Sequence, residues 1–395
     1  MSHTKKSKNT IFRIIPGLII LSLSFGTVYG ENIPTSDRYW NDVARYLGGL
    51  SPLPGSSTEK FETKPEAAIH RKFFIKSWEN VETKNLSPQT EWAKTQIQQE
   101  RSSDRTVFYP FSGPDFLNIF TFLPNGKEYI LFGMEPPGLP PDPEMISPAQ
   151  LPTALANLRN SLATILNFSF FRTIDMNKDL SKTDLGGTTP VILVFMSRTG
   201  NAVKNVENVA LEKEGTIRLI KDPHAIVNGK PTAKTLRVLP DEIPGVKITF
   251  RRPDASADQY LYYFSLDISD TGLKSKGQLL TFVKNKGQKS TYLKAASYLM
   301  YRDTFSMIRN FILDECVFIM QDDSGMPLNS FKTDLWNLKF YGNYIKPIQL
   351  FESRFQPDLR AVYTEKKNQI GELPFGIGYN WKQGESNLMT ARKIK

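Results

Sequence analysis

The sequence predicts an α+β fold of mixed α/β character, with N-terminal helices followed by mixed, largely antiparallel strands and interspersed helices. Three observations lead to this prediction. Apolar residues recur at helical spacing in the first third of the chain, short apolar and aromatic runs typical of strands fill the middle, and helical spacing returns between the later strands. Because strands and helices do not alternate regularly, a repeated strand–helix–strand series is disfavoured.

Three helices are expected in the first third of the chain. The first begins at Ser36, a residue type that caps helices, and ends at Gly48-Gly49. The second covers residues 65–82. The third covers residues 87–100 and has a proline at its first helical position, where the missing N–H is no loss.

The rest of the chain carries strand signals broken by helix signals. Residues 106–111 and 128–134 are expected strands, and the capping-box sequence Ser147–Gln150 precedes a helix whose leucines follow at three- and four-residue steps. The further expected strands are 191–196, a hairpin over 206–220 that turns at Glu214-Gly215, 234–239, 245–251, 259–267, 316–320 and 336–341. The further expected helices are 288–301, 304–314 and 357–368.

A secretory signal peptide is expected over residues 1–30. Four basic residues precede an apolar run over 14–28, and Val28-Tyr29-Gly30 offers a cleavage site. As a helix the run spans ~22 Å, short of the ~30 Å hydrocarbon core of a bilayer. We therefore expect an exported protein, periplasmic or secreted, with no integral membrane segment after cleavage; an uncleaved anchor is the alternative.

The mature chain is expected to contain two lobes. Residues 31–185 form a helical and mixed N-terminal lobe and residues 186–395 a mixed α/β C-terminal lobe, with a boundary near Gly186-Gly187; one continuous domain over 31–395 is the alternative.

Charge and cysteine content exclude several classes of protein. The chain has a net charge of +10, which falls to +6 when the four basic residues of the signal segment are removed. This mild excess does not predict nucleic-acid binding. The single cysteine excludes a disulfide framework, and we expect Cys316 to be a buried, inert thiol. The basic residues at 392–395 are expected to form a solvated tail.

Two polar loops that each follow an expected strand supply candidate catalytic residues. The first carries Ser112 and Asp115, and the second carries Asp322, Asp323 and Ser324. Loops at strand ends are where α/β proteins often hold ligands. The serines could be nucleophiles or hydrogen-bond donors, and the aspartates acid–base groups or metal ligands. The same residue types form good turns, so a purely structural role is the alternative.

A calcium-binding loop is a weaker candidate. Asp175, Asn177 and Asp179 occupy the first, third and fifth positions of such a loop, but Leu180 stands where the turn needs glycine and Gly186 where a bidentate glutamate belongs. No metal site is therefore expected. No cofactor is expected either, since the sequence contains neither a P-loop nor a Gly-x-Gly-x-x-Gly motif.

Three segments carry a resemblance to other proteins: Tyr109–Phe116 (YPFSGPDF), Lys294–Met300 (KAASYLM) and Gln321–Gly325 (QDDSG). They resemble segments of a family of uncharacterised exported bacterial proteins, over about residues 100–350. The resemblance implies an exported bacterial chain of about this size, and no functional residue carries over from it.

Two functions are expected from these observations. The first is a non-catalytic binding or structural protein of the periplasm or cell envelope, whose partner is an unknown envelope component, polysaccharide or protein. The aromatic segment 376–381 is its candidate contact surface. The alternative is a periplasmic hydrolase whose site is built from the Ser112–Asp115 and Asp322–Ser324 loops. Convergence of the two loops with a raised aspartate pKa would favour the enzyme.

Overall fold

The computed structural model describes residues 36–168, 185–221, 225–227, 230–232 and 238–394. Pro34–Lys395 form one compact unit. The predicted signal segment, the calcium-loop candidates Asp175, Asn177 and Asp179, and most of the strand predicted at 234–239 lie outside the described residues. None of the helices described is long and apolar enough to span a bilayer.

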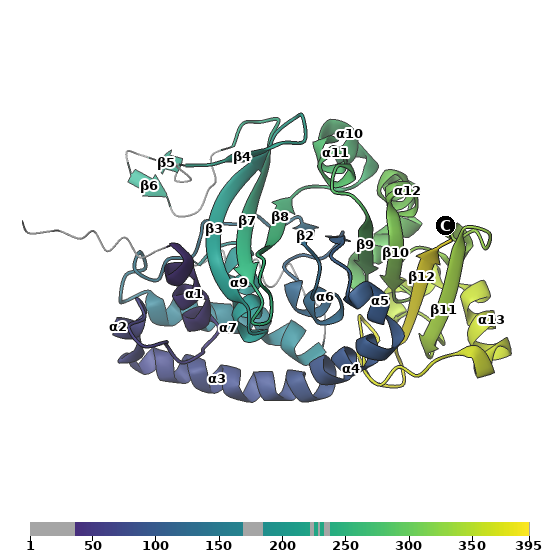
Figure 1. Ribbon diagram of the computed structural model, residues 1–395, viewed down its shortest axis with the longest axis horizontal. Coiled ribbons are helices and arrows are strands. Elements are labelled where there is room, and N and C mark those ends of the chain that lie inside the picture. Colours follow the sequence, from purple (N-terminus) through teal and green to yellow (C-terminus); the bar gives the residue numbers. More distant parts are fainter. Residues whose placement is uncertain (1–35, 169–184, 222–224, 228–229, 233–237, 395) are drawn as a thin grey trace, which may run out of the picture. The chain divides into compact units, whose positions relative to one another are not determined.

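A ten-stranded mixed sheet forms the centre of this unit (Figure 1). Its spatial order is β11-β12-β10-β9-β1-β2-β8-β7-β3-β4. The strands are β1 Thr106–Tyr109, β2 Glu128–Gly133, β3 Ala202–Leu211, β4 Ile217–Leu219, β7 Ile243–Arg251, β8 Gln259–Ser265, β9 Lys289–Leu293, β10 Cys316–Gln321, β11 Trp336–Gly342 and β12 Asn387–Lys393. A separate ribbon pairs β5 Ala225–Val227 with β6 Lys230–Thr232.

The five central strands, β10-β9-β1-β2-β8, run parallel, and the strands outside them are antiparallel. The α+β fold with a mixed sheet is thus confirmed, although the parallel centre was not expected. Strands from both sides of the predicted lobe boundary pair in this one sheet, because β2 lies beside β8 and β1 beside β9.

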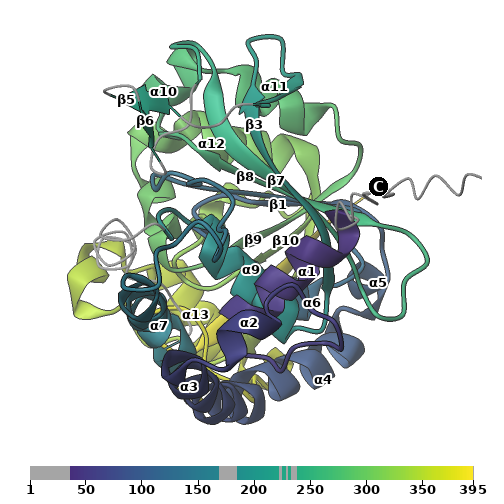
Figure 2. The same ribbon diagram turned by 90° about the vertical axis from the view of Figure 1, so that its left-hand side faces the viewer.

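Helices cover both faces of the sheet (Figure 2). The helices are α1 Ser36–Leu47, α2 Glu59–Glu62, α3 Pro65–Val81, a π-helix Glu82–Leu86, α4 Ser87–Gln96, α5 Gln98–Arg101, α6 Phe116–Phe122, α7 Leu151–Phe168, α9 Thr189–Arg198, α10 Asp270–Ser275, α11 Gln278–Lys284, α12 Ser306–Glu315 and α13 Pro357–Glu365. One hydrophobic core, the first core, contains α1, α3, α6, α7 and α9, and the second core contains α10, α11 and α12.

Alternation of side chains along each central strand builds these two cores. In β1, Val107 and Tyr109 enter the first core and Phe108 enters the second. In β10, Phe318 enters the first core and Ile319 the second. Because both faces are covered, these strands read as continuous apolar runs, as parallel strands usually do.

Two predicted elements are wrong. Residues 191–196 form the middle of helix α9, not a strand, because this helix is buried on all sides and so has no polar face to give a helical period. Residues 289–293 form β9, not a helix. This strand begins with Lys289, which is buried and donates hydrogen bonds to two backbone carbonyls and to Glu315. Because of this lysine, the sequence of a central strand reads as a polar segment.

The prediction of a solvated basic tail is also wrong for residues 392 and 393. Arg392 and Lys393 belong to β12, which lies between β10 and β11. Arg392 forms two hydrogen bonds with the buried carboxylate of Glu100, at 2.7 and 3.0 Å. By contrast, the predicted hairpin over 206–220 is confirmed, since β3 and β4 pair on either side of Gly215.

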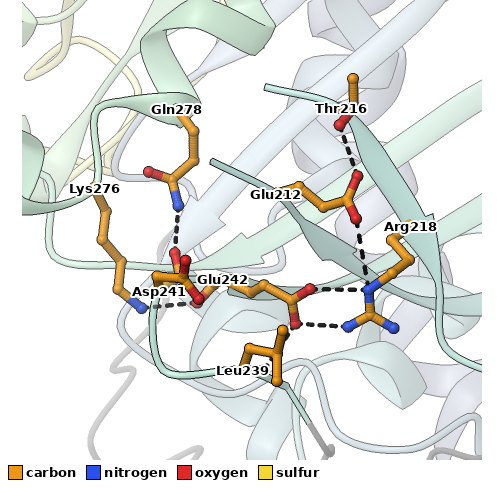
Figure 3. Close-up of polar contacts among 8 residues, drawn as sticks. All are labelled: Glu212, Thr216, Arg218, Leu239, Asp241, Glu242, Lys276 and Gln278. Atoms are coloured by element: carbon orange, nitrogen blue, oxygen red, sulfur yellow. Dashed lines mark hydrogen bonds and ion pairs between the residues drawn. The ribbon is translucent and has the colours of Figure 1, made fainter. Parts of the chain in front are cut away.

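A polar network fixes β4 and the turn before β7 (Figure 3). The guanidinium of Arg218 donates to both carboxylate oxygens of Glu242, at 2.8 and 2.6 Å, and lies 3.7 Å from Glu212. Lys276 and Gln278 donate to the backbone carbonyls of Glu242 and Asp241, both at 2.7 Å. These contacts satisfy the turn's polar groups, so we assign the network a structural role.

Candidate active site

The candidate site lies at the carboxyl ends of β1, β9 and β10. The chain leaves β1 through α6, in the first core, towards β2 on one side. It leaves β9 through α12, in the second core, towards β10 on the other side. Adjacent parallel strands whose connections turn to opposite faces form a topological switch point, the place where open α/β sheets bind ligands.

A buried ion pair joins the loops that follow β1 and β9. Lys294 Nζ lies 2.8 Å from Asp115 Oδ2, and both side chains are almost fully buried. Asp115 also caps α6, since its Oδ1 accepts hydrogen bonds from the backbone N–H of Asn118 at 3.1 Å and from its side-chain amide at 2.9 Å. The hydroxyl of Tyr109 donates to Oδ2 at 3.0 Å. These donors compensate for removing the carboxylate from water.

Two adjacent carboxyl groups follow β10 beside this pair. Asp322 and Asp323 are 4% and 5% exposed. Asp322 Oδ1 accepts from the backbone N–H of Ser324 at 2.9 Å and from its hydroxyl. Asp323 accepts from the hydroxyl of Tyr298 and, at 3.0 Å, from the side-chain amide of Asn387 at the start of β12. Each carboxyl group is therefore held in a fixed orientation.

The electrostatics of the pair favour retention of a proton. Burial raises the pKa of Asp322 to about 7, with a further increase from the charge of Asp323, while the contacts with Ser324 and the ammonium of Lys294 oppose the shift. Burial also raises the pKa of Asp323. Two neighbouring carboxylates do not both ionise readily in a site shielded from water, which favours a protonated state of one of the two carboxyl groups near neutral pH.

The backbone is strained at both loops. Among the described residues, only Phe111 (φ 60°) and Ala295 (φ 57°) adopt the left-handed conformation without being glycine. Phe111 follows β1 and Ala295 follows Lys294, so both strained residues flank the Lys294–Asp115 pair. This conformation costs about 1–2 kcal/mol for an L-residue, and such strain is concentrated at functional sites.

An aromatic stack begins at Tyr298, whose hydroxyl donates to Asp323. Phe351 stacks on Tyr298 with 4.5 Å between ring centroids and on Tyr379 with 5.4 Å. Tyr298 is buried, whereas Phe351 and Tyr379 are half-buried.

One buried hydroxyl near Asp115 and Asp322 lacks a hydrogen-bond partner. The hydroxyl of Tyr292 on β9 is fully buried and forms no hydrogen bond with any described residue. Burial raises the pKa of this hydroxyl, with further increases from the charges of Asp115 and Asp322. An unpaired buried donor costs about 1–3 kcal/mol.

The structure brings the five predicted site residues to this end of the sheet, with different roles. The hydroxyl of Ser112 donates to the carbonyl of Phe132 at 3.2 Å and accepts from its N–H at 3.0 Å, which fixes the first loop to β2. Ser324 holds Asp322. Both serines therefore position the site. Asp115, Asp322 and Asp323 carry its charge.

Sequence reasoning missed Lys294, Tyr292, Tyr298 and Asn387. The first three lie on or after β9, which was predicted to be a helix, so their proximity to Asp115 and Asp322 was hidden. Asn387 belongs to β12, which was not predicted. One sequence signal was available: Lys294 and Tyr298 belong to Lys294–Met300, one of the three segments that resemble other exported proteins.

Other candidate groups lie elsewhere. Cys316 is buried, as predicted, and burial raises the pKa of its thiol to about 12, which disfavours the reactive thiolate. His70 is buried between the carbonyl of Leu47, at 2.8 Å, and Arg159, at 3.2 Å, and burial lowers its pKa to about 4. Within the described residues, no group of three or more histidines, cysteines or carboxylates is arranged to hold a metal ion.

Comparison with known proteins adds no assignment. No family model matches the chain, and no curated protein matches it. The resemblance to exported bacterial proteins therefore stays a prediction.

Proposed function

We propose that this protein is an acid–base enzyme, a hydrolase that uses the Asp322–Asp323 pair. The observation that carries the proposal is the pair itself: two adjacent buried carboxyl groups, one with a pKa raised to about 7, at a topological switch point. The strained residues Phe111 and Ala295 support it, because turn formation alone does not require strain. Turns that only connect strands usually lie exposed on the surface, whereas the loop that carries Asp322 and Asp323 is buried.

The proposed reaction starts with one carboxyl group of the pair ionised and the other protonated. The ionised carboxylate of the pair accepts a proton from water as the water oxygen attacks the electrophilic carbon of the substrate. The protonated carboxyl donates its proton to the leaving group, so the pair again holds one proton after the bond is cleaved. Lys294 and the hydroxyl of Tyr292 supply a positive charge and a donor for an oxygen that becomes negative.

The proposal is tested with purified protein incubated with a bacterial envelope preparation. Mass spectrometry of the supernatant detects released fragments. We expect release that is abolished in the Asp322→Asn/Asp323→Asn variant and retained in Glu365→Gln, which removes an exposed carboxylate of α13. Release should also fall as the pH rises through about 7, because the carboxyl group that acts as the acid then loses its proton. Equal release by the two variants, or no release by the unaltered protein, would contradict the hydrolase.

We further propose that the protein works outside the cytoplasm, as the basic and apolar residues of 1–30 predict. Export is tested by fractionating cells that produce the full chain and sequencing the N-terminus of the product. A protein that begins at Glu31 in the periplasmic or secreted fraction is expected. A full-length cytoplasmic product would contradict export.

A further inference from the structure

A second candidate site is a cleft lined in part by the loop 374–383. Its volume is about 690 Å³, within the range of small-ligand pockets. The end of α3, the π-helix, the end of α7 and the loop 374–383 line it. The side chains that define its chemistry are Asn80, Lys84, Asn85, Asn167, Trp381 and Lys382. No acidic side chain is among the described residues that line it.

An unusual backbone segment shapes one wall of the cleft. The π-helix Glu82–Leu86 interrupts the helical path from α3 to α4, with Leu86 buried as its anchor. Single π-helical turns are rare and occur frequently at functional sites. Here the turn places Lys84 and Asn85 at the cleft. Lys84 is exposed and forms no ion pair with any described residue.

The opposite wall is preformed. The N–H of Ile377 donates to the hydroxyl of buried Ser386 at 2.9 Å, and that hydroxyl also contacts the carbonyls of Asn380 and Lys382. A Cβ at Gly376 would overlap the carbonyl of Trp381, so the chain can make this close approach only with glycine there. The indole of Trp381 is thus presented by a fixed loop, which reduces the entropy lost on binding.

The lining matches a sugar in three ways. Trp381 is 37% exposed, and the electron-rich face of its ring suits the weakly positive C–H groups on one face of a sugar ring. Asparagine amides both donate and accept, as hydroxyl groups require. The two lysines, Lys84 and Lys382, favour a negatively charged ligand. Lys382 lies 3.9 Å from Glu385, but both side chains are about 60% exposed, so this pair holds the ammonium weakly.

We propose that the cleft binds an acidic sugar, a unit of a polysaccharide that carries a carboxylate. The sugar ring stacks on Trp381, the amides of Asn80, Asn85 and Asn167 pair with its hydroxyls, and its carboxylate lies between Lys84 and Lys382. This inference is independent of the proposed hydrolase, because no residue of the carboxyl pair lines the cleft.

The test measures binding of oligogalacturonate to the full protein by titration calorimetry. Its neutral counterpart, an oligogalactoside of equal length, and adenosine monophosphate are titrated in parallel. We expect the acidic oligosaccharide to bind at least ~10-fold more tightly than the neutral one, a difference of ~1.4 kcal/mol, and to weaken as salt is added. Equal affinity for the neutral oligosaccharide, tighter binding of the nucleotide, or no binding at ~5 mM ligand overturns the proposal.

Matched variants locate the site. Trp381→Ala should weaken binding about tenfold, and Phe355→Ala, which removes an exposed ring elsewhere, should not change it. Lys84→Gln should weaken binding several-fold and reduce its salt dependence, whereas Lys76→Gln, an exposed lysine of α3 outside the cleft, should do neither. Trp381→Phe keeps a ring and should retain most of the affinity, which separates lost stacking from a disturbed loop. Unchanged binding in both Trp381→Ala and Lys84→Gln would overturn the assignment.

Discussion

Gly378 lies directly against the carboxylate of Asp322, with its backbone in the left-handed conformation at φ 60°. A Cβ at this position would overlap Asp322 Oδ2. Position 378 therefore requires glycine for two reasons, its left-handed backbone conformation and the lack of space for a side chain. The loop 374–383 therefore contacts Asp322 through Gly378 and also carries Trp381, which lines the cleft.

The first prediction concerns that contact. The left-handed backbone conformation alone should make Gly378→Ala cost about 1–2 kcal/mol. The total loss in the free energy of unfolding should be larger, because the loop must also move away from Asp322. Gly287→Ala is the matched control, since Gly287 has φ 70° and open space around its Cβ position. Urea unfolding measures both. Equal losses in the two variants would show that the overlap is relieved without cost.

The second prediction concerns the pH dependence caused by Asp322. Its folded-state pKa, about 7, is above the usual value, so the folded protein binds more protons than the unfolded chain between about pH 4 and 7, and stability decreases as the pH rises through this range. Asp322→Asn should therefore change the melting temperature little at pH 4. The increase in melting temperature that it causes should grow as the pH rises to 7. Each unit of pKa difference contributes about 1.4 kcal/mol. A difference between variant and parent that is constant with pH would refute the raised pKa.

The third prediction concerns the Lys294–Asp115 pair. Lys294→Met leaves a buried carboxylate without its cation and should destabilise the protein by about 3–5 kcal/mol. Lys294→Met/Asp115→Asn should recover a large part of this loss, because the asparagine removes the uncompensated charge while keeping a cap for α6. Denaturant unfolding of the single and double variants gives the coupling energy. Additive effects would mean that the two groups do not stabilise each other.

The fourth prediction concerns Glu242, whose pKa shifts in the opposite direction. The hydrogen bonds from Arg218 lower the pKa of Glu242, so its stabilisation is present above the unfolded-state pKa and is lost as the pH falls through the lowered value. Glu242→Gln should cost about 1–2 kcal/mol at pH 7 and nothing at about pH 2. Glu385→Gln, in an exposed pair 3.9 Å from Lys382, should have no measurable effect. A loss in Glu242→Gln that persists at the lowest pH would indicate a packing effect.

The candidate site was partly visible in the sequence. The loops with Ser112, Asp115 and Asp322–Ser324 were found because turn-forming residues follow short apolar strands, and this pattern depends on local backbone chemistry. Their convergence was not visible, because it depends on parallel pairing of β1 with β9, and β9 looks polar. A buried lysine at position 289 contradicts the apolar pattern of a central strand until Glu315 and the neighbouring carbonyls are known.

The fold was predictable where one face of an element is polar, as in α1 and α3, and unpredictable where no face is. Helix α9 shows the limit. Thr189–Ser197 are all buried, so hydrophobicity varies little along the segment and its β-branched residues favour a strand on local preference. Packing between the sheet and the surrounding helices overrides that preference.

The pairing of β1 with β9 also governs how the chain can fold. Thr106 lies opposite Lys289, so one edge of β1 stays unpaired until a segment far along the chain arrives. Contacts between such distant segments require closure of long loops, which slows folding and favours a single late, cooperative step. A nascent chain that has passed β2 but not β9 exposes an apolar strand edge, so chaperone binding during synthesis should be strongest over that interval.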